Sequence, residues 1–274
     1  MSLKIKVGFI GFGRMGSALA RGAVASGVLK KKQISAFDPD PQSQKKIKAS
    51  GFHASTHLLD VLLKSDLVFL CVKPQKMDEV LVESAPFLRH HKKQDLCLVS
   101  IAAGVPLSKL EARLGRTVPL LRVMPNTPAL LNCGMSAVSR GKASTSRHEK
   151  WVHTILEGVG AVVNVPEKFM DAVTALSGSG PAYVFYLTEA MKEAGIKLGL
   201  ASGLARQLAH QTVYGAGMML KKLPEEAGAL RVQVTSPGGT TEAAIREFDF
   251  KKMKPLIFSA IQKAALRSKE LSRR

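Results

Sequence analysis

The sequence predicts an α/β chain with two parts: an N-terminal domain built on a parallel sheet, followed by an all-α C-terminal domain. In the first 165 residues, short β-branched or continuous apolar runs alternate with helical stretches, a pattern typical of a parallel sheet covered by helices on both faces. After that point apolar residues recur at spacings of three and four, which indicates helices. We therefore expect domains of residues 1–165 and 166–274.

Each element follows from a local pattern of this kind. The expected strands are Ile5–Ile10, Ile34–Phe37, Leu67–Val72, Leu96–Ile101, Val118–Val123, Met135–Ser139 and Ala161–Val163, and the helices of the first domain are Arg14–Ser26, Pro41–Ala49, Lys76–Leu88, Leu107–Leu114 and Thr145–Leu156. Runs of Gly, Pro and Ser divide the second domain into about five helices. These breaks fall at Ser177–Pro181, Leu200–Ser202, Pro224–Gly228 and Ser236–Gly239.

Composition excludes several classes of protein. With 274 residues, 46% hydrophobic and 22% charged, the chain is neither disordered nor fibrous. Its three cysteines, Cys71, Cys97 and Cys133, have no CxxC spacing, so we expect free thiols in a reducing cytoplasm and no bound metal. Apolar runs such as Leu67–Val72 are too short to span a membrane, and the N-terminal run indicates a strand and turn, not a signal peptide. The net charge of +19 keeps nucleic acid, acidic membranes and small anions as possible partners.

A glycine-rich turn carries the first functional signal. Gly11, Gly13 and Gly16 form GxGxxG between an expected strand and an expected helix. In such a turn the first glycine permits the sharp bend, the second lets the backbone approach a pyrophosphate and the third lets helix and strand pack closely. Asp38 follows the second strand, 22 residues after Gly16, where a carboxylate can bond the adenine ribose. The first domain is therefore predicted to be a Rossmann-type dinucleotide-binding domain, although the glycines could also serve packing alone.

The choice of dinucleotide stays open at this point. A carboxylate at Asp38 repels the 2′-phosphate of NADPH, which favours NADH. Arg14, Lys45 and Lys46 could compensate with positive charge, which leaves NADPH as the alternative.

Five further segments follow the glycine turn in order: Val72-Lys73-Pro74, Ser100-Ile101-Ala102-Ala103-Gly104-Val105, Arg122-Val123-Met124-Pro125-Asn126-Thr127-Pro128, Leu176-Ser177-Gly178-Ser179-Gly180-Pro181-Ala182-Tyr183 and Ser236-Pro237-Gly238-Gly239-Thr240-Thr241. With the turn, they make the chain resemble the pyrroline-5-carboxylate reductases over essentially its whole length. The resemblance implies an oxidoreductase that reduces the C=N bond of L-1-pyrroline-5-carboxylate with hydride from NADH or NADPH, the last step of proline biosynthesis. It also implies a homodimer formed by the C-terminal helices, rings of dimers, and active sites shared between subunits.

The same resemblance implies roles for particular residues. The cofactor would be held by Gly11, Phe12, Gly13, Arg14, Met15, Gly16, Asp38, Val72, Lys73, Pro74, Ala102, Ala103, Gly104 and Asn126, and the substrate by Asn126, Ser177, Ser236, Gly239, Thr240 and Thr241. One position departs from the family: Asn is common near the cofactor ribose where His57 and Leu58 stand here.

The residues of the Ser236 segment also suit this chemistry directly. They precede an apolar-periodic run, so their amides are expected at a helix N-terminus, which binds an anion such as the substrate carboxylate. Thr241 is the candidate catalytic residue, bonding the ring nitrogen of a substrate that binds as the iminium or receives its proton through water. Two structural alternatives remain: Thr241 could simply cap that helix, and Ser177 could cap a restarting one.

Two other functions fit the sequence less well. A β-hydroxyacid dehydrogenase has a similar domain order, but it needs a general base, commonly a lysine, and residues 175–183 contain none. A nucleic-acid-binding protein would account for the net charge of +19, yet only 5% of residues are aromatic and the basic residues are spread along the chain. We therefore expect a small-molecule substrate, with neither nucleic acid nor membrane as partner.

Overall fold

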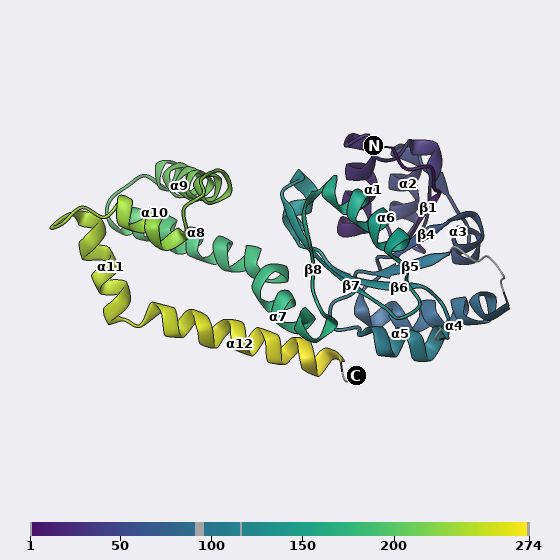
Figure 1. The fold of residues 1–274 in the computed structure, drawn as a ribbon. Coiled ribbons are helices and arrows are strands. Elements are labelled where there is room, and N and C mark those ends of the chain that lie inside the picture. The colour runs from purple at the N-terminus through teal and green to yellow at the C-terminus, as the bar shows by residue number, and fades with distance from the viewer. Residues whose placement is uncertain (1, 91–95, 116, 273–274) are drawn as a thin grey trace. The chain divides into compact units, whose positions relative to one another are not determined.

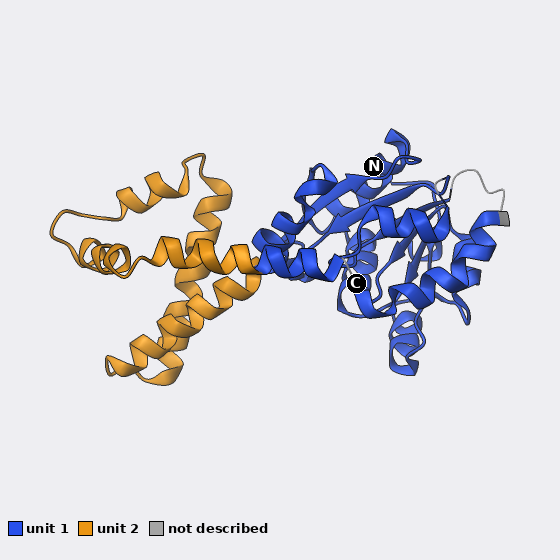
Figure 2. Cartoon of the chain, turned by 90° about the horizontal axis from the view of Figure 1, so that it is seen from below, with its two compact units in different colours: residues 1–179, 264–274 blue, residues 180–263 orange. Residues whose placement is uncertain are grey.

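The computed structural model describes residues 2–90, 96–115 and 117–272. By packing, the chain divides into two compact units: residues 1–179 with 264–274, and residues 180–263 (Figure 2). The first unit is therefore discontinuous in sequence. Packing divides the chain at Ser179, later than the sequence division at residue 165, because a short helix at Met170–Val173 packs on the sheet of the first unit.

The first unit contains an eight-stranded sheet of order β3-β2-β1-β4-β5-β6-β7-β8. The strands are β1 (Val7–Ile10), β2 (Ile34–Phe37), β3 (His53–Ala54), β4 (Leu67–Leu70), β5 (Cys97–Ser100), β6 (Leu120–Met124), β7 (Gly134–Arg140) and β8 (Gly160–Asn164). In the central register Gly8 stands opposite Ser35 on one side and Val68 on the other. Strand β3 was not predicted, because two residues, one of them an exposed histidine, show no apolar pattern.

The predicted parallel sheet is present, with one pair that the sequence did not predict: β6 and β7 are antiparallel, and the other pairs are parallel. The reason is the connection between them. It holds only a short 3₁₀ helix, Thr127–Leu131, whereas a parallel pair needs a crossover of a dozen or more residues. Between β7 and β8 the helix α6 (Ser146–Glu157) supplies such a crossover, and that pair is parallel.

Helices cover both faces of the sheet, as predicted (Figure 1). One core cluster joins the sheet to α1 (Arg14–Ala25), α2 (Pro41–Ala49) and α6, and the other joins it to α3 (Leu58–Lys64), α4 (Pro74–His90) and α5 (Leu107–Leu114). Within β4, Leu67 and Phe69 belong to the first cluster and Val68 and Leu70 to the second. This alternation shows why strands buried on both faces appear in the sequence as continuous apolar runs.

The chain after β8 is helical, as predicted. Its elements are a 3₁₀ helix (Glu167–Phe169), α7 (Met170–Val173), a π-helix (Thr174–Gly178), α8 (Gly180–Lys197), α9 (Ser202–Lys222), α10 (Ala227–Gln233), α11 (Thr240–Phe250) and α12 (Met253–Ser272). One break was not predicted: α11 and α12 are separated at Lys251 and Lys252, where Lys252 has φ +56°. None of the described helices combines the length and apolar character of a membrane-spanning segment.

The helices of the second unit bury little of their apolar surface within it. Helices α8 and α11 have no buried residue, and α10 has only Leu230. Large side chains such as Phe185, Tyr186 and Phe258 are between 67% and 76% exposed. Contiguous apolar exposure on this scale marks a surface that another molecule covers.

Candidate active site

The glycine turn lies where the order of the sheet reverses. Strand β1 has β2 on one side and β4 on the other, so the chain leaves β1 in one direction and later returns to the opposite side. In open parallel sheets, ligands bind at the carboxyl ends of the strands that flank such a point. The turn that follows β1 is therefore at the expected edge of the sheet.

Each glycine of the turn has its own structural reason. Gly11 has φ +93°, and a Cβ there would lie 2.7 Å from the carbonyl oxygen of Cys71, so the bend requires glycine. A Cβ on Gly16 would collide with the Gly11 carbonyl oxygen. Beside Gly13 the space is open, with nothing within 4 Å of an added Cβ. This open space at the start of α1 fits a pyrophosphate, which the first amides of a helix bind well.

Asp38 is held against the glycine turn. Its Oδ2 accepts a hydrogen bond from the Phe12 N–H at 2.7 Å, and its Oδ1 accepts one from the Asp40 N–H at 3.0 Å. Asp40 caps the N-terminus of α2, and the Ser43 hydroxyl, which donates to this carboxylate, lowers the pKa of Asp40. Two carboxylates therefore stand at the carboxyl end of β2.

A cavity of about 300 Å³ opens at this edge of the sheet. Its walls come from the first turn of α1, from the carboxyl ends of β4, β5 and β6 with the residues that follow them, and from the π-helix. They comprise Met15, Cys71, Val72, Lys73, Pro74, Ile101, Ala102, Ala103, Met124, Pro125, Asn126, Thr127 and Gly178. Seven of these residues are among those that the sequence predicted to hold the cofactor. Burial raises the pKa of the Cys71 thiol, so this thiol is neutral at physiological pH.

Asn126 bridges two walls of the cavity. Its Nδ2 donates to the Ser177 carbonyl oxygen at 3.1 Å, and its Oδ1 accepts from the Met135 N–H at 2.8 Å. Ser177 itself lies inside the π-helix, so it does not cap a restarting helix. Its Oγ is buried and has no hydrogen-bond partner among the described residues. Such isolated π-helical turns are frequent at functional sites.

A buried ion pair fixes the segments that carry these walls. Arg122 of β6 is 5% exposed, and its Nη1 lies 3.2 Å from Glu167 Oε1. The same oxygen accepts the Leu107 N–H at 2.6 Å, at the start of α5, where Pro106 provides no side-chain cap. Glu167 therefore joins β6, α5 and the beginning of the C-terminal helices.

The Ser236 segment forms the N-terminus of α11, within the second unit. The N-cap is Gly239, so Thr240 and Thr241 are the first two residues of the helix and Thr241 is not its cap. The amide of Ala243 donates to Gly239, which leaves the first three amides, those of Thr240, Thr241 and Glu242, without an intrahelical partner. The Thr241 side chain is half-buried.

Glu242 stabilises the turn before this helix. Its Oε2 accepts the Gly238 N–H at 2.7 Å, and its Oε1 accepts from Arg246 Nη2 at 2.9 Å. The Gly238 hydrogen bond, followed by the charge of Arg246, lowers the pKa of Glu242. Gly238 has φ +70°, which favours glycine at this position.

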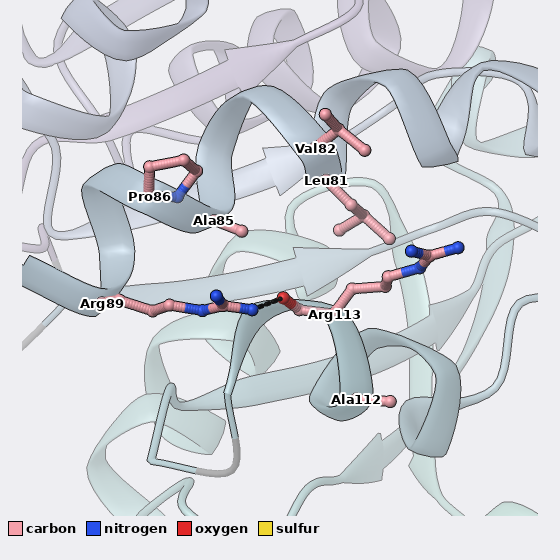
Figure 3. Close-up of a pocket in the computed structure, with 7 residues that line it drawn as sticks. All are labelled: Leu81, Val82, Ala85, Pro86, Arg89, Ala112 and Arg113. Atoms are coloured by element: carbon pink, nitrogen blue, oxygen red, sulfur yellow. Dashed lines mark hydrogen bonds between the residues drawn. The ribbon is translucent and has the colours of Figure 1, made fainter.

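A second cavity of about 300 Å³ lies between α4 and α5 (Figure 3). It is lined by Leu81, Val82, Ala85, Pro86 and Arg89 of α4 and by Ala112 and Arg113 of α5, and none of the predicted site residues lines it. Arg89 donates through Nη2 to the Arg113 carbonyl oxygen at 3.1 Å, which satisfies an acceptor in the last turn of α5. We assign the functional site to the cavity at the strand ends.

Six residues lining that cavity were not predicted as binding residues: Cys71, Ile101, Met124, Pro125, Thr127 and Gly178. Cys71 and Ile101 are at the carboxyl ends of predicted strands, and this position was the signal that could have identified them. The structure does not place Ser236, Gly239, Thr240 or Thr241 relative to the cavity, because they belong to the second unit.

Two family models match the chain. Residues 167–271 match the pyrroline-5-carboxylate reductase dimerisation family, and residues 6–104 match the family described as NADP oxidoreductase, coenzyme F420-dependent.

Relatives and solved structures agree with the family models. The chain is 39% identical over 268 residues to a pyrroline-5-carboxylate reductase of Arabidopsis thaliana, covering 97% of this chain and 95% of that protein. It is 40% identical to one from Pseudomonas aeruginosa, covering 97% of both chains. Similar solved structures include a Coxiella burnetii pyrroline-5-carboxylate reductase (32% identical, TM-score 0.91, covering 98% of this chain and 99% of that one). Another is a Plasmodium falciparum pyrroline carboxylate reductase with NADP bound (31%, TM-score 0.87, covering 99% and 100%).

Proposed function

The chain belongs to the pyrroline-5-carboxylate reductase family, and from this premise we propose which of its residues bind the cofactor, bind the substrate and take part in the reaction. The reaction reduces L-1-pyrroline-5-carboxylate to L-proline with NADH or NADPH, and it is the last step of proline biosynthesis. One hydride is added to the carbon of the C=N bond and one proton to its nitrogen, and the dinucleotide leaves oxidised.

We propose that the cofactor occupies the edge of the sheet at the glycine turn. The open space beside Gly13 would take the pyrophosphate, and Asp38 would bond the adenine ribose. Val72, Lys73 and Pro74 with Ala102 and Ala103 would form the walls around the nicotinamide, near Asn126. Bound there, the nicotinamide supplies the hydride from its C4. The observation that carries this assignment is the cavity that joins these segments in one place.

Two carboxylates favour NADH as the preferred cofactor. Asp38 and Asp40 both lie at the end of β2, where they would repel a 2′-phosphate, and a ribose diol needs acceptors of this kind. The nearby cations Arg14, Lys45 and Lys46 would favour NADPH instead.

A paired assay with NADH and NADPH on the same preparation tests this choice and the reaction together. Failure to oxidise either dinucleotide on addition of L-1-pyrroline-5-carboxylate would contradict the function itself.

We propose that the substrate carboxylate binds at the N-terminus of α11. The amides of Thr240 and Thr241 have no intrahelical partner, and the carboxylate of Glu242 bonds the Gly238 amide instead of theirs. The hydroxyl of Thr241 would then bond the ring nitrogen. A threonine hydroxyl is a weak acid, so the substrate binds protonated as the iminium or receives its proton from water through Thr241. Ser177 and Ser236 would complete the substrate contacts.

A homodimer accounts for the solvent-exposed apolar side chains of the second unit. Helices α8 and α11 bury no side chain in the single chain, and the matched family model describes dimerisation. We propose that residues 166–274 form the dimer, that dimers assemble further into rings, and that each active site combines segments of two chains. Light scattering coupled to gel filtration measures the assembly.

Shared sites can be tested by complementation between two inactive chains. One chain carries Thr241→Ala, and the other carries Gly13→Asp, which places a carboxylate where the pyrophosphate would lie. If Thr241 acts in the partner's site, half of the active sites in the mixed dimer are native and activity returns. If Thr241 acts within its own chain, no site in the mixture is native and activity stays at the level of the separate variants.

We propose a cytoplasmic enzyme without nucleic-acid or membrane partners. In support, all three cysteines are free thiols, as is usual in reducing compartments, and the basic residues are spread along the chain. Nucleic-acid binding at physiological salt, with a steep dependence of log affinity on log salt, would contradict this assignment.

A further inference from the structure

The last turn of α12 makes an unusual contact for an amphipathic helix. Of its twenty residues, from Met253 to Ser272, only one is buried, and that residue is a serine: Ser268, at 4% exposure. Its Oγ donates to Oδ1 of Asp171 in α7 at 2.7 Å. A buried hydroxyl needs such a partner, so a specific polar contact helps to dock this end of the helix.

Leu271, in the same turn, lies directly against the loop that follows β5. A Cβ built on Gly104 would be 2.9 Å from Leu271 Cβ and 3.5 Å from the Ser268 carbonyl oxygen. Gly104 also has φ +71°, a conformation that other residues rarely adopt. The backbone of this loop is therefore in van der Waals contact with the last turn of α12, without an intervening side chain.

These two contacts reach two different walls of the cofactor cavity. Ala102 and Ala103, which line it, immediately precede Gly104. Asp171 lies in α7, which continues into the π-helix that ends at Gly178, another lining residue. No residue of α12 is among those that line the cavity, so an effect of its last turn on the cavity has to pass through these two segments.

We propose that Ser268 and Leu271 are positioning residues that hold the Ala102–Gly104 loop in the shape that accepts the dinucleotide. The proposal rests on the cofactor site assigned above and adds to it an element from the far end of the chain. A loop held in its binding shape avoids the cost of ordering it when ligand binds, so loss of the contact should weaken cofactor affinity more than turnover.

Two shortened chains test the role of Leu271, used as full dimers. One ends at Glu270 and lacks Leu271, and the matched control ends at Ser272 and keeps it. Isothermal titration calorimetry with NADH, and separately with NADPH, gives the dissociation constant without any turnover. We expect the chain ending at Glu270 to bind the preferred dinucleotide about fivefold more weakly than the control. Its KM for the dinucleotide should rise to a similar degree, while kcat and the KM for L-1-pyrroline-5-carboxylate change by less than about twofold.

Two point variants test Ser268. Ser268→Ala should weaken dinucleotide binding in the same way, and Ser268→Thr, which keeps the hydroxyl, should restore it. Equal dissociation constants for the two shortened chains, or for Ser268→Ala and the natural chain, would overturn the proposal, even if the melting temperature fell. If the natural chain bound neither dinucleotide, the cofactor site itself would be wrong, so the two failures can be told apart.

Discussion

The carboxylate of Asp38 accepts the backbone N–H of Phe12, with 2.7 Å between Oδ2 and the nitrogen. The residue expected to select the cofactor thus also supports the glycine turn that would hold its phosphates. A substitution there changes two properties at once, unless the hydrogen-bond acceptor is kept.

Asp38→Asn separates these properties, because it removes the charge and keeps an oxygen acceptor for Phe12. We expect the ratio of kcat/KM for NADPH to that for NADH to rise roughly tenfold, since repulsion of the 2′-phosphate is lost. Steady-state kinetics with both dinucleotides measure the ratio. Asp38→Ala, which loses the acceptor as well, should lower kcat/KM with both. An unchanged ratio in Asp38→Asn would show that Asp38 does not face the 2′ position.

Gly13→Ala and Gly16→Ala form a matched pair with opposite outcomes. A Cβ at Gly13 meets open space, and the φ of −68° suits alanine, so the protein should fold normally but bind the dinucleotide roughly tenfold more weakly. A Cβ at Gly16 collides with the Gly11 carbonyl oxygen, so that variant should lose about 2 kcal/mol of stability. Urea unfolding and dinucleotide titration distinguish them. A destabilised Gly13→Ala with native affinity would contradict the assigned roles.

Thr241→Ala should reduce turnover more than stability. The Thr241 side chain is not the cap of α11, so its removal leaves the helix intact, whereas loss of a hydrogen bond to the charged imine nitrogen should lower kcat about tenfold or more. Thr241→Ser, which keeps the hydroxyl, should retain most activity and serves as the control. A native kcat in Thr241→Ala, measured at saturating substrate, would remove Thr241 from the reaction.

The pair Arg122 and Glu167 should respond asymmetrically to mutation. Glu167→Ala leaves the guanidinium of Arg122 buried without its partner, at a cost of about 3 kcal/mol. Arg122→Met leaves a carboxylate that is one-third exposed and still accepts the Leu107 N–H, so it should cost less. Urea midpoints of the two variants compare these costs. If Arg122→Met lost as much stability as Glu167→Ala or more, the contacts of the guanidinium would contribute more to stability than the hydrogen bond that Glu167 accepts from the Leu107 N–H, and this prediction would be wrong.

Glu242 should stabilise the fold in a pH-dependent way. Its folded pKa lies below the ordinary value of 4.5, so its contribution is fully present above that pH and is lost as pH falls through the lowered folded pKa. The difference in urea midpoint between the natural chain and Glu242→Gln should therefore be largest at neutral pH and shrink in acid. Glu247→Gln, at an exposed position in the same helix, is the control. A difference that grows as pH falls would contradict this sign.

The sequence alone predicted most of the fold, and the reasons differ among elements. The glycine turn was predictable because its glycines follow a fixed spacing between a strand and a helix, and Gly11 and Gly16 each meet a local constraint on φ or contact distance. The antiparallel β6–β7 pair was not predicted, because apolar runs do not report strand direction; only the short connection at Thr127–Leu131 indicates it.

The contacts that shape the site are harder to predict from the sequence, because they join residues that are far apart along the chain. Arg122 and Glu167 are 45 positions apart, and Ser268 and Asp171 are 97 apart. No periodicity links such pairs. The π-helix around Ser177 was also beyond prediction, because its Gly and Ser residues suggest a break, whereas the chain continues through one wide turn. The placement of Thr241 in a substrate site stays a prediction.

The discontinuity of the first unit has a consequence for how the protein is made. Residues 264–274 complete a unit whose other 179 residues are synthesised first. The loop after β5 at Gly104 can therefore contact Leu271 only after all of the second unit has been synthesised. The sheet can form before residues 264–274 leave the ribosome, so under our proposal the loop at the cofactor cavity would be the last part of the first unit to take its binding shape.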